Sequence, residues 1–158
     1  SRSEGARVDL PGTDRLTARA PEERCAVEAI QGQSPAACVV VVDAAAPARG
    51  LYLAHQIAET GTPIVLALNM MDEARTAGTE IDEAVLGKRF NAPVVAVVAS
   101  RGEGLAELRQ AVLGAMAAPR RAMDPILDEP TTVCKTHLTR PPTTRVRCYV
   151  ARRAPDAT

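Results

Sequence analysis

Three apolar runs and one shorter segment near the start, each ending at polar or small residues, set the pattern of this chain. The clearest is residues 63–68, which begin with a proline and stop at Asn69. A continuous apolar run without alternation is typical of a parallel strand that is buried on both faces. The same pattern predicts two further strands, at residues 38–43 and 93–98, and residues 6–10 are predicted to be the end of a strand that Pro11 and Gly12 break.

The segments between these runs have the periodicity of helices. Pro47 and Gly61 are predicted to delimit one helix, and Asp82 is predicted to cap another. Further helical segments are predicted at residues 21–30, 73–77 and 103–117. In the last of these, one apolar stripe is expected to contain Leu105, Leu108, Val112 and Ala115. Because strand and helix alternate, we expect an α/β fold with right-handed crossovers and a mostly parallel sheet.

The pattern is lost after Pro119, which divides the chain into residues 1–118 and 119–158. The second part is rich in Pro, Thr and Arg, with eight basic against four acidic residues. Low apolar content favours a solvated, disordered tail over one that binds nucleic acid or acidic lipid headgroups. Within this tail, residues 145–150 have the alternation of a short strand.

Composition narrows the function classes. The chain has 19 basic and 19 acidic residues, so its overall charge gives no reason to expect a nucleic-acid partner. Four cysteines without a close pair and two histidines predict neither a zinc site nor a disulfide framework. No apolar run approaches the roughly 20 residues that a membrane span needs.

The strongest chemical signal is the Asn-x-x-Asp pattern formed by Asn69 and Asp72. In an open parallel sheet, ligands bind outside the carboxyl ends of the strands, where these two side chains would lie. GTPases recognise guanine with this pattern, because the carboxylate accepts the two N–H groups of the guanine edge. Adenine lacks those donors and would leave the carboxylate unpaired. The alternative is that both residues merely form a turn or cap the next helix.

The other predicted strands end in residues that fit the same chemistry. The carboxylate of Asp9 can hold Mg²⁺ through a water, and the amide of Gly12 can approach a γ-phosphate, although a plain turn is an alternative. Asp43 is better explained as a capping residue. The loop at Ala99 and Ser100 could donate a backbone N–H to the guanine carbonyl, or simply lead into the next helix. The order of these four strand ends favours a GTPase site over the separate alternatives.

Five stretches of the sequence are informative together: VDLPGT at 8–13, PEE at 21–23, VVDA at 41–44, ALNMMDEA at 67–74 and GEG at 102–104. These stretches resemble the cytosolic G domain of ferrous iron transport protein B. The resemblance covers about residues 4–116 and is most specific at Met70, where most GTPases have Lys. A flexible thioether can pack along the base face at that position.

The resemblance implies a Ras-like P-loop GTPase fold that binds GTP or GDP with Mg²⁺ and hydrolyses GTP slowly. It implies coupling to Fe²⁺ uptake through a transmembrane iron-permease domain of the same family, which this chain lacks, at the cytoplasmic side of the bacterial inner membrane. It implies no nucleic-acid partner.

Residue roles follow from the same resemblance. Asp9 would be the Mg²⁺-side carboxylate, Gly12 the γ-phosphate sensor, and residues 13–24 a switch. Asn69, Met70 and Asp72 would bind guanine, with Ala99 and Ser100 in the loop that contacts its carbonyl. No catalytic residue is assigned, because Thr13 stands where a water-orienting Gln would follow Gly12.

The departures from the family are equally informative. No segment has the phosphate-loop pattern G-x-x-x-x-G-K-[ST], and only four residues precede Gly5. We therefore expect an N-terminally truncated, partial G domain over residues 1–118 that binds GTP weakly and has no measurable turnover alone.

A second consequence concerns the sheet. The family's strand before the phosphate loop lies between those ending at Leu10 and Asp43, so we expect either a gap there or direct pairing of these two. The alternative function is a degenerate, non-catalytic nucleotide-fold module, or an inert fragment, that acts only through protein contacts. A dinucleotide-dependent oxidoreductase is disfavoured, because no G-x-G-x-x-G follows a strand.

Overall fold

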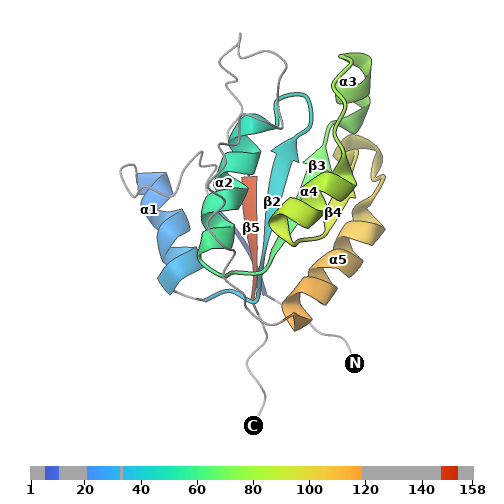
Figure 1. Cartoon of the computed structure of the whole chain (residues 1–158). Helices are drawn as coiled ribbons and strands as arrows, with labels where there is room; N and C mark the ends of the chain where they lie inside the picture. The colour runs from blue at the N-terminus through green and yellow to red at the C-terminus, as the bar shows by residue number, and fades with distance from the viewer. Residues whose placement is uncertain (1–5, 11–20, 33, 119–146, 153–158) are drawn as a thin grey trace.

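The computed structural model describes residues 6–10, 21–32, 34–118 and 147–152, and shows one five-stranded sheet flanked by helices (Figure 1). The strand order is β1-β5-β2-β3-β4. The strands are β1 (Ala6–Asp9), β2 (Ala37–Asp43), β3 (Ile64–Asn69), β4 (Val94–Ala96) and β5 (Arg147–Arg152). The α-helices are α1 (Pro21–Val27), α2 (Ala48–Glu59), α3 (Met71–Thr76), α4 (Glu83–Phe90) and α5 (Leu105–Ala117). A π-helical turn, η1 (Glu28–Gly32), extends α1, and a 3₁₀ turn, η2 (Ala99–Arg101), follows β4.

The four predicted strands are confirmed, and they run in the same direction. β2 pairs in parallel with β3, and β3 with β4, while β1 and β2 are both antiparallel to the strand between them. β4 is shorter than predicted, with three residues. The alternation of strands and helices confirms the α/β fold expected from the sequence.

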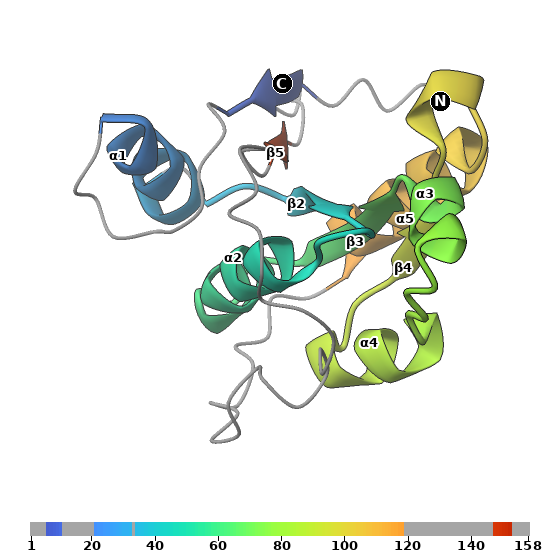
Figure 2. The same cartoon turned by 90° about the horizontal axis from the view of Figure 1, so that it is seen from above.

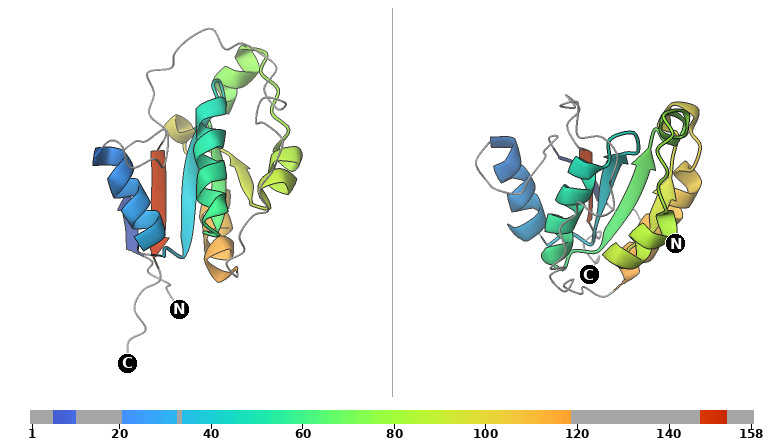
Figure 3. Two further views of the ribbon diagram at one scale, coloured as in Figure 1. Left: turned by 60° about the vertical axis from the view of Figure 1, so that its left-hand side comes forward. Right: turned by 45° about the horizontal axis from the view of Figure 1, so that its top comes forward.

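The sequence predicted either a gap between β1 and β2 or direct pairing of these two strands, and both expectations are wrong. β5 occupies this position, antiparallel to both neighbours (Figure 3). It overlaps the alternation noted at 145–150 and lies within the segment expected to be a disordered tail; residues 119–146 and 153–158 lie outside the described part. A strand with two paired edges satisfies its backbone groups, which explains why a strand is favoured over solvation here.

Two apolar layers cover the sheet because the side chains of each strand alternate between its faces. Figure 2 shows α1, α2 and α4 on one face and α5 on the other. On β2, Cys38, Val40 and Val42 belong to the cluster of the first face, while Ala37 and Val39 belong to the second. The first face is the larger core, because residues of α1, α2, α3 and α4 all belong to its cluster.

Helix ends follow the sequence signals in two places. The Asp82 carboxylate caps α4 by accepting a hydrogen bond from the Val85 N–H at 3.0 Å. Gly61, just beyond α2, has the positive φ of 75° that its predicted C-terminal role requires.

The apolar stripe predicted for α5 is partly wrong. Ala115 is buried, and Leu108 and Val112 pack against the sheet, but Leu105 is 47% exposed. Helical side chains tilt toward the N-terminus, so a side chain in the first turn points past the helix end and away from the sheet. Among the helices that the structure describes, none is long and apolar enough to cross a membrane.

Candidate nucleotide-binding site at the strand ends

The carboxyl ends of β1, β2, β3 and β4 meet along one edge of the sheet, here called the rim. Asp9, Asp43 and Asn69 are the last residues of their strands, and Asp43 and Asn69 lie opposite each other in register. Backbone hydrogen bonds extend the pairing of β2 with β3 and of β3 with β4 by one residue each. The Ala44 N–H donates to the Asn69 carbonyl at 2.9 Å, and the Val97 N–H donates to the Leu68 carbonyl at 2.8 Å. The rim around β2, β3 and β4 is therefore a continuous hydrogen-bonded surface.

Asn69 connects the ends of β3 and β4. Its Oδ1 accepts a hydrogen bond from the Ala99 N–H at 3.2 Å, across 30 positions of sequence. The side-chain NH₂ of an asparagine carries two further donors. Because Ala99 opens η2, this bond holds the Asn-x-x-Asp turn and the loop after β4 as one unit.

Met70 has a backbone conformation that is uncommon for a residue with a side chain. Its φ of 62° and ψ of 35° place it in the left-handed region, where the Cβ crowds the following carbonyl at a cost of about 1–2 kcal/mol. The turn lets the chain leave β3 and start α3 immediately, with Met71 buried and Asp72 in the first helical turn. Met70 is thus held beside the two polar residues of the pattern, and its side chain is half-buried.

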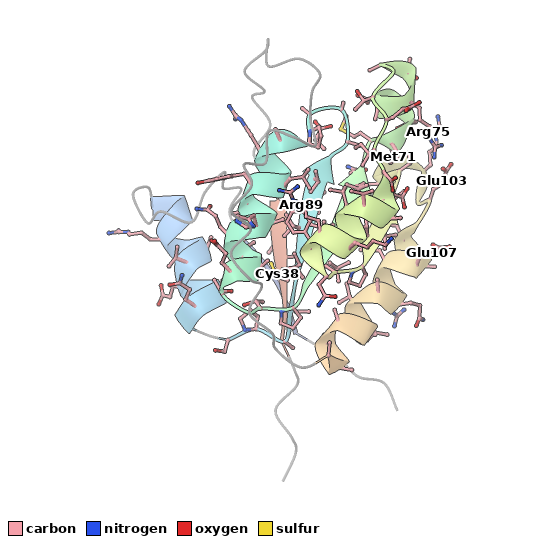
Figure 4. All side chains as sticks on the ribbon, viewed as in Figure 1. Cys38, Met71, Arg75, Arg89, Glu103 and Glu107 are labelled. Atoms are coloured by element: carbon pink, nitrogen blue, oxygen red, sulfur yellow. The ribbon has the colours of Figure 1, made fainter. Side chains whose placement is uncertain are left out.

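Asp72 has an ionic partner that the sequence did not reveal. Its Oδ2 lies 3.8 Å from Arg101 Nη2, and Arg101 Nη1 lies 3.9 Å from Glu103 Oε1. Figure 4 shows Met71, Arg75 and Glu103 at this end of the molecule. The contact joins α3 to η2 across 29 positions of sequence, so no local pattern could have indicated it.

Asp43 binds its own turn. Its Oδ1 accepts the Ala45 N–H at 2.8 Å, an arrangement typical of an aspartate that starts a turn. The N-cap of α2 is Pro47, so Asp43 does not cap the helix. The capping role favoured from the sequence is therefore wrong: the Asp43 carboxylate stabilises the turn after β2, four residues before the N-cap of α2.

The remaining predicted residues lie farther away or outside the described part. Asp9 is exposed at the end of β1, and β5 separates it from β2. Gly12 and residues 13–20 are not among the described residues, so the sensor and most of the switch stay predictions. Ala99 and Ser100 are both exposed in η2.

The side chains near the rim show whether the described residues alone could bind a metal ion. Within the described ranges, no group of three or more His, Cys, Asp or Glu side chains could hold a metal ion. The single exposed carboxylate of Asp9 could hold a hard cation such as Mg²⁺ only through a water, with the other oxygen ligands supplied by other groups.

Comparison with known proteins points to one family. A family model for ferrous iron transport protein B matches residues 2–112. The chain is 38% identical over 109 residues to the Fe(2+) transporter FeoB of Salmonella typhimurium, and 34% identical over 120 residues to an iron transport fusion protein of Porphyromonas gingivalis. These matches cover 66% and 75% of this chain, but 14% of each relative, so the chain corresponds to a small part of those proteins.

Solved structures agree with this match. The FeoB G-domain from Methanococcus jannaschii is 40% identical, with a TM-score of 0.68 over 70% of this chain and 71% of that one. The cytosolic domain of the T. maritima FeoB iron transporter in its GMPPNP form is 32% identical, with a TM-score of 0.68 over 72% of this chain and 46% of that one. With its matching family model and these shared Ras-like structures, the chain belongs to the ferrous iron transport protein B family.

Proposed function

We propose that the rim between β3 and α5 recognises the guanine base of GTP or GDP. One observation supports this most strongly: the Asn69 side chain binds the Ala99 N–H at 3.2 Å, so the two segments expected to contact the base form a single unit. Asp72 would accept the two N–H groups of the guanine edge. Asn69 would direct its NH₂ donors to acceptors of the base, which has N7 and O6 on its other edge.

Met70 and η2 would complete the base site. Met70 occupies the left-handed turn directly after Asn69, and its flexible thioether would pack on the base face. The Ala99 N–H is already bound by Asn69, so contact with the guanine carbonyl would require this donor to be shared or exchanged. Ser100 lies in the same exposed turn and would line the base.

The phosphate side of the site is less complete. The chain has no G-x-x-x-x-G-K-[ST] motif. Anion-binding loops follow the carboxyl end of a strand and lead into a helix, whereas β5 is antiparallel and has its amino end at the rim. We therefore propose that this chain alone binds GTP weakly and has no measurable turnover.

Mg²⁺ would accompany the nucleotide. Asp9 would hold it through water and Gly12 would approach the γ-phosphate. The ion would supply charge neutralisation of the phosphates, while the protein contributes a single carboxylate from the rim.

The role in the cell would be that of a longer protein. The curated relatives are named Fe(2+) transporters, and this chain spans 14% of their length. We propose that the domain belongs to a polypeptide in which guanine-nucleotide binding and hydrolysis are coupled to Fe²⁺ uptake by a transmembrane permease domain, at the cytoplasmic side of the bacterial inner membrane.

A second candidate is a non-catalytic module that acts through protein contacts. The position of β5 favours it, because a strand that enters between β1 and β2 fills the place in the sheet next to the phosphate side. Guanine specificity distinguishes the two candidates.

The test is a titration of the whole, ¹⁵N-labelled chain with Mg²⁺–GDP and Mg²⁺–ADP at millimolar concentration. Amide shifts at residues 69–72 and 99–101 with GDP but not ADP support the proposal. Asp72→Asn should weaken GDP binding at least tenfold, because the carboxylate loses its complementarity to the guanine edge. Glu107→Gln, at an exposed site on α5, is the matched control and should change nothing.

Two results would contradict the proposal. Equal shifts with ADP, or unchanged GDP affinity in Asp72→Asn, would favour the non-catalytic module. Micromolar GTP affinity with Mg²⁺ by calorimetry would overturn the weak-binding expectation while leaving base recognition intact.

A further inference from the structure

Arg101 lies between two carboxylates at the base side of the rim. Its Nη2 is 3.8 Å from Asp72 Oδ2, and its Nη1 is 3.9 Å from Glu103 Oε1. The side chains of Arg101 and Glu103 are 63% and 61% exposed, whereas that of Asp72 is 39% exposed. The more buried carboxylate is the one proposed to recognise guanine.

Guanine and Arg101 would compete for the same group. The guanine edge presents two N–H donors, which use both carboxylate oxygens of an aspartate. The Arg101 guanidinium already lies at ion-pair distance from one of these oxygens, Asp72 Oδ2. We propose that Arg101 is a positioning residue that pairs with Asp72 in the nucleotide-free site and must release Oδ2 when guanine binds. This inference rests on the proposed recognition of guanine, and it predicts that Arg101 lowers guanine affinity.

Glu103 would hold the released side chain. The backbone keeps the two residues close: the Val98 N–H donates to the Glu103 carbonyl at 3.1 Å, and Gly102, with a φ of 72°, closes the turn between them. Arg101 can therefore leave Asp72 and keep an ionic partner. Since both pairs are exposed, the exchange involves small free energies.

These relations predict effects of opposite sign. Arg101→Ala should raise GDP affinity roughly two- to fivefold, the range expected when a competing exposed ion pair is removed. Glu103→Gln should lower it, because Arg101 loses its alternative partner and stays on Asp72. Arg101→Lys keeps the positive charge, so its GDP affinity should stay close to that of the unsubstituted chain.

The experiment is a GDP titration of the whole chain by amide shifts at residues 69–72 and 99–101, in 50 and 500 mM NaCl. The ratio of the GDP affinity of Arg101→Ala to that of the unsubstituted chain should fall toward one in high salt, since salt screens exposed ion pairs. Arg75→Ala is the matched control: it removes the same charge from α3, where the residue is exposed, and should not reproduce the gain. A purely structural role for Arg101 would not produce this salt dependence.

The outcomes separate the two proposals. If no variant and no unsubstituted chain shows GDP-specific shifts, guanine recognition is wrong, and this inference is wrong with it. If the unsubstituted chain binds GDP but Arg101→Ala binds no more tightly, or gains equally at both salt concentrations, only the role of Arg101 is wrong.

Discussion

The two halves of the sheet are assembled in different ways. β2, β3 and β4 come from one stretch of chain, pair in parallel and are linked by helices that cover them. β1 and β5 come from residues 6–9 and 147–152 and pair antiparallel. The base side of the candidate site belongs to the first half and the phosphate side to the second, so local crossovers fix the former while distant pairing fixes the latter.

The largest effect is expected in the core of the first half. Leu66, fully buried on β3, packs in the larger cluster, so Leu66→Ala should lower the free energy of unfolding by about 2–5 kcal/mol. Urea denaturation measures this. Leu113→Ala, at a 39% exposed position on α5, is the control and should stay within about 0.5 kcal/mol. Equal losses would show that the β3 core is not the stabilising centre.

The next effect tests the dependence of β1 on β5. Tyr149 lies opposite Asp9 on one side and Val39 on the other, and a proline there removes its N–H from the ladder. Tyr149→Pro should cost about 1–3 kcal/mol. Amide hydrogen exchange should speed up in β1 while β3 stays protected.

The control for that substitution is Tyr149→Phe, which keeps the N–H and should leave β1 protected. If β1 keeps its protection in Tyr149→Pro, then β5 does not hold β1 in the sheet.

A smaller effect concerns the link across the rim. Asn69→Ala removes the acceptor for the Ala99 N–H and should cost about 0.5–1.5 kcal/mol, with faster exchange of the Ala99 amide. Asn69→Asp keeps an acceptor oxygen and should restore most of the protection. Slow Ala99 exchange in Asn69→Ala would mean that the loop is held by other contacts.

The smallest change should be stabilising. Met70→Gly removes the steric cost of the left-handed φ of 62°, about 1–2 kcal/mol. Glycine also gives the unfolded chain more conformational entropy, which offsets roughly half of that gain. The free energy of unfolding should therefore rise by up to about 1 kcal/mol. A thermal melt would show a small rise in Tm. Met71→Gly is the contrast: the residue is buried in α3, so the same change should destabilise the protein.

The sequence was most informative where the period of the pattern was unambiguous. The apolar run before Asn69 has the length and flanking proline of a buried strand and forms β3, and Asp82 caps its helix as expected. The exposed Leu105 was missed because a stripe at helical spacing does not show where the sheet ends beneath it.

The missed features at the rim are non-local. Residues 145–150 showed strand alternation, but nothing local indicated that β5 would pair with both β1 and β2. The contact of Arg101 with Asp72 likewise joins η2 to α3, which only the folded sheet brings together. The Asn-x-x-Asp pattern was visible in sequence, whereas the hydrogen bond that ties it to Ala99 was not.

The pairing of β1 with β5 also has a consequence for synthesis. It joins the sixth residue of the chain to the 152nd. At about 5–20 residues per second, β1 waits on the order of ten seconds for its partner to be translated. During that interval β2, β3 and β4 can already assemble with their helices, leaving one edge of β2 unpaired. A chaperone that binds exposed strand edges could therefore reach this edge of β2 in the nascent chain, whereas β5 covers it in the folded sheet.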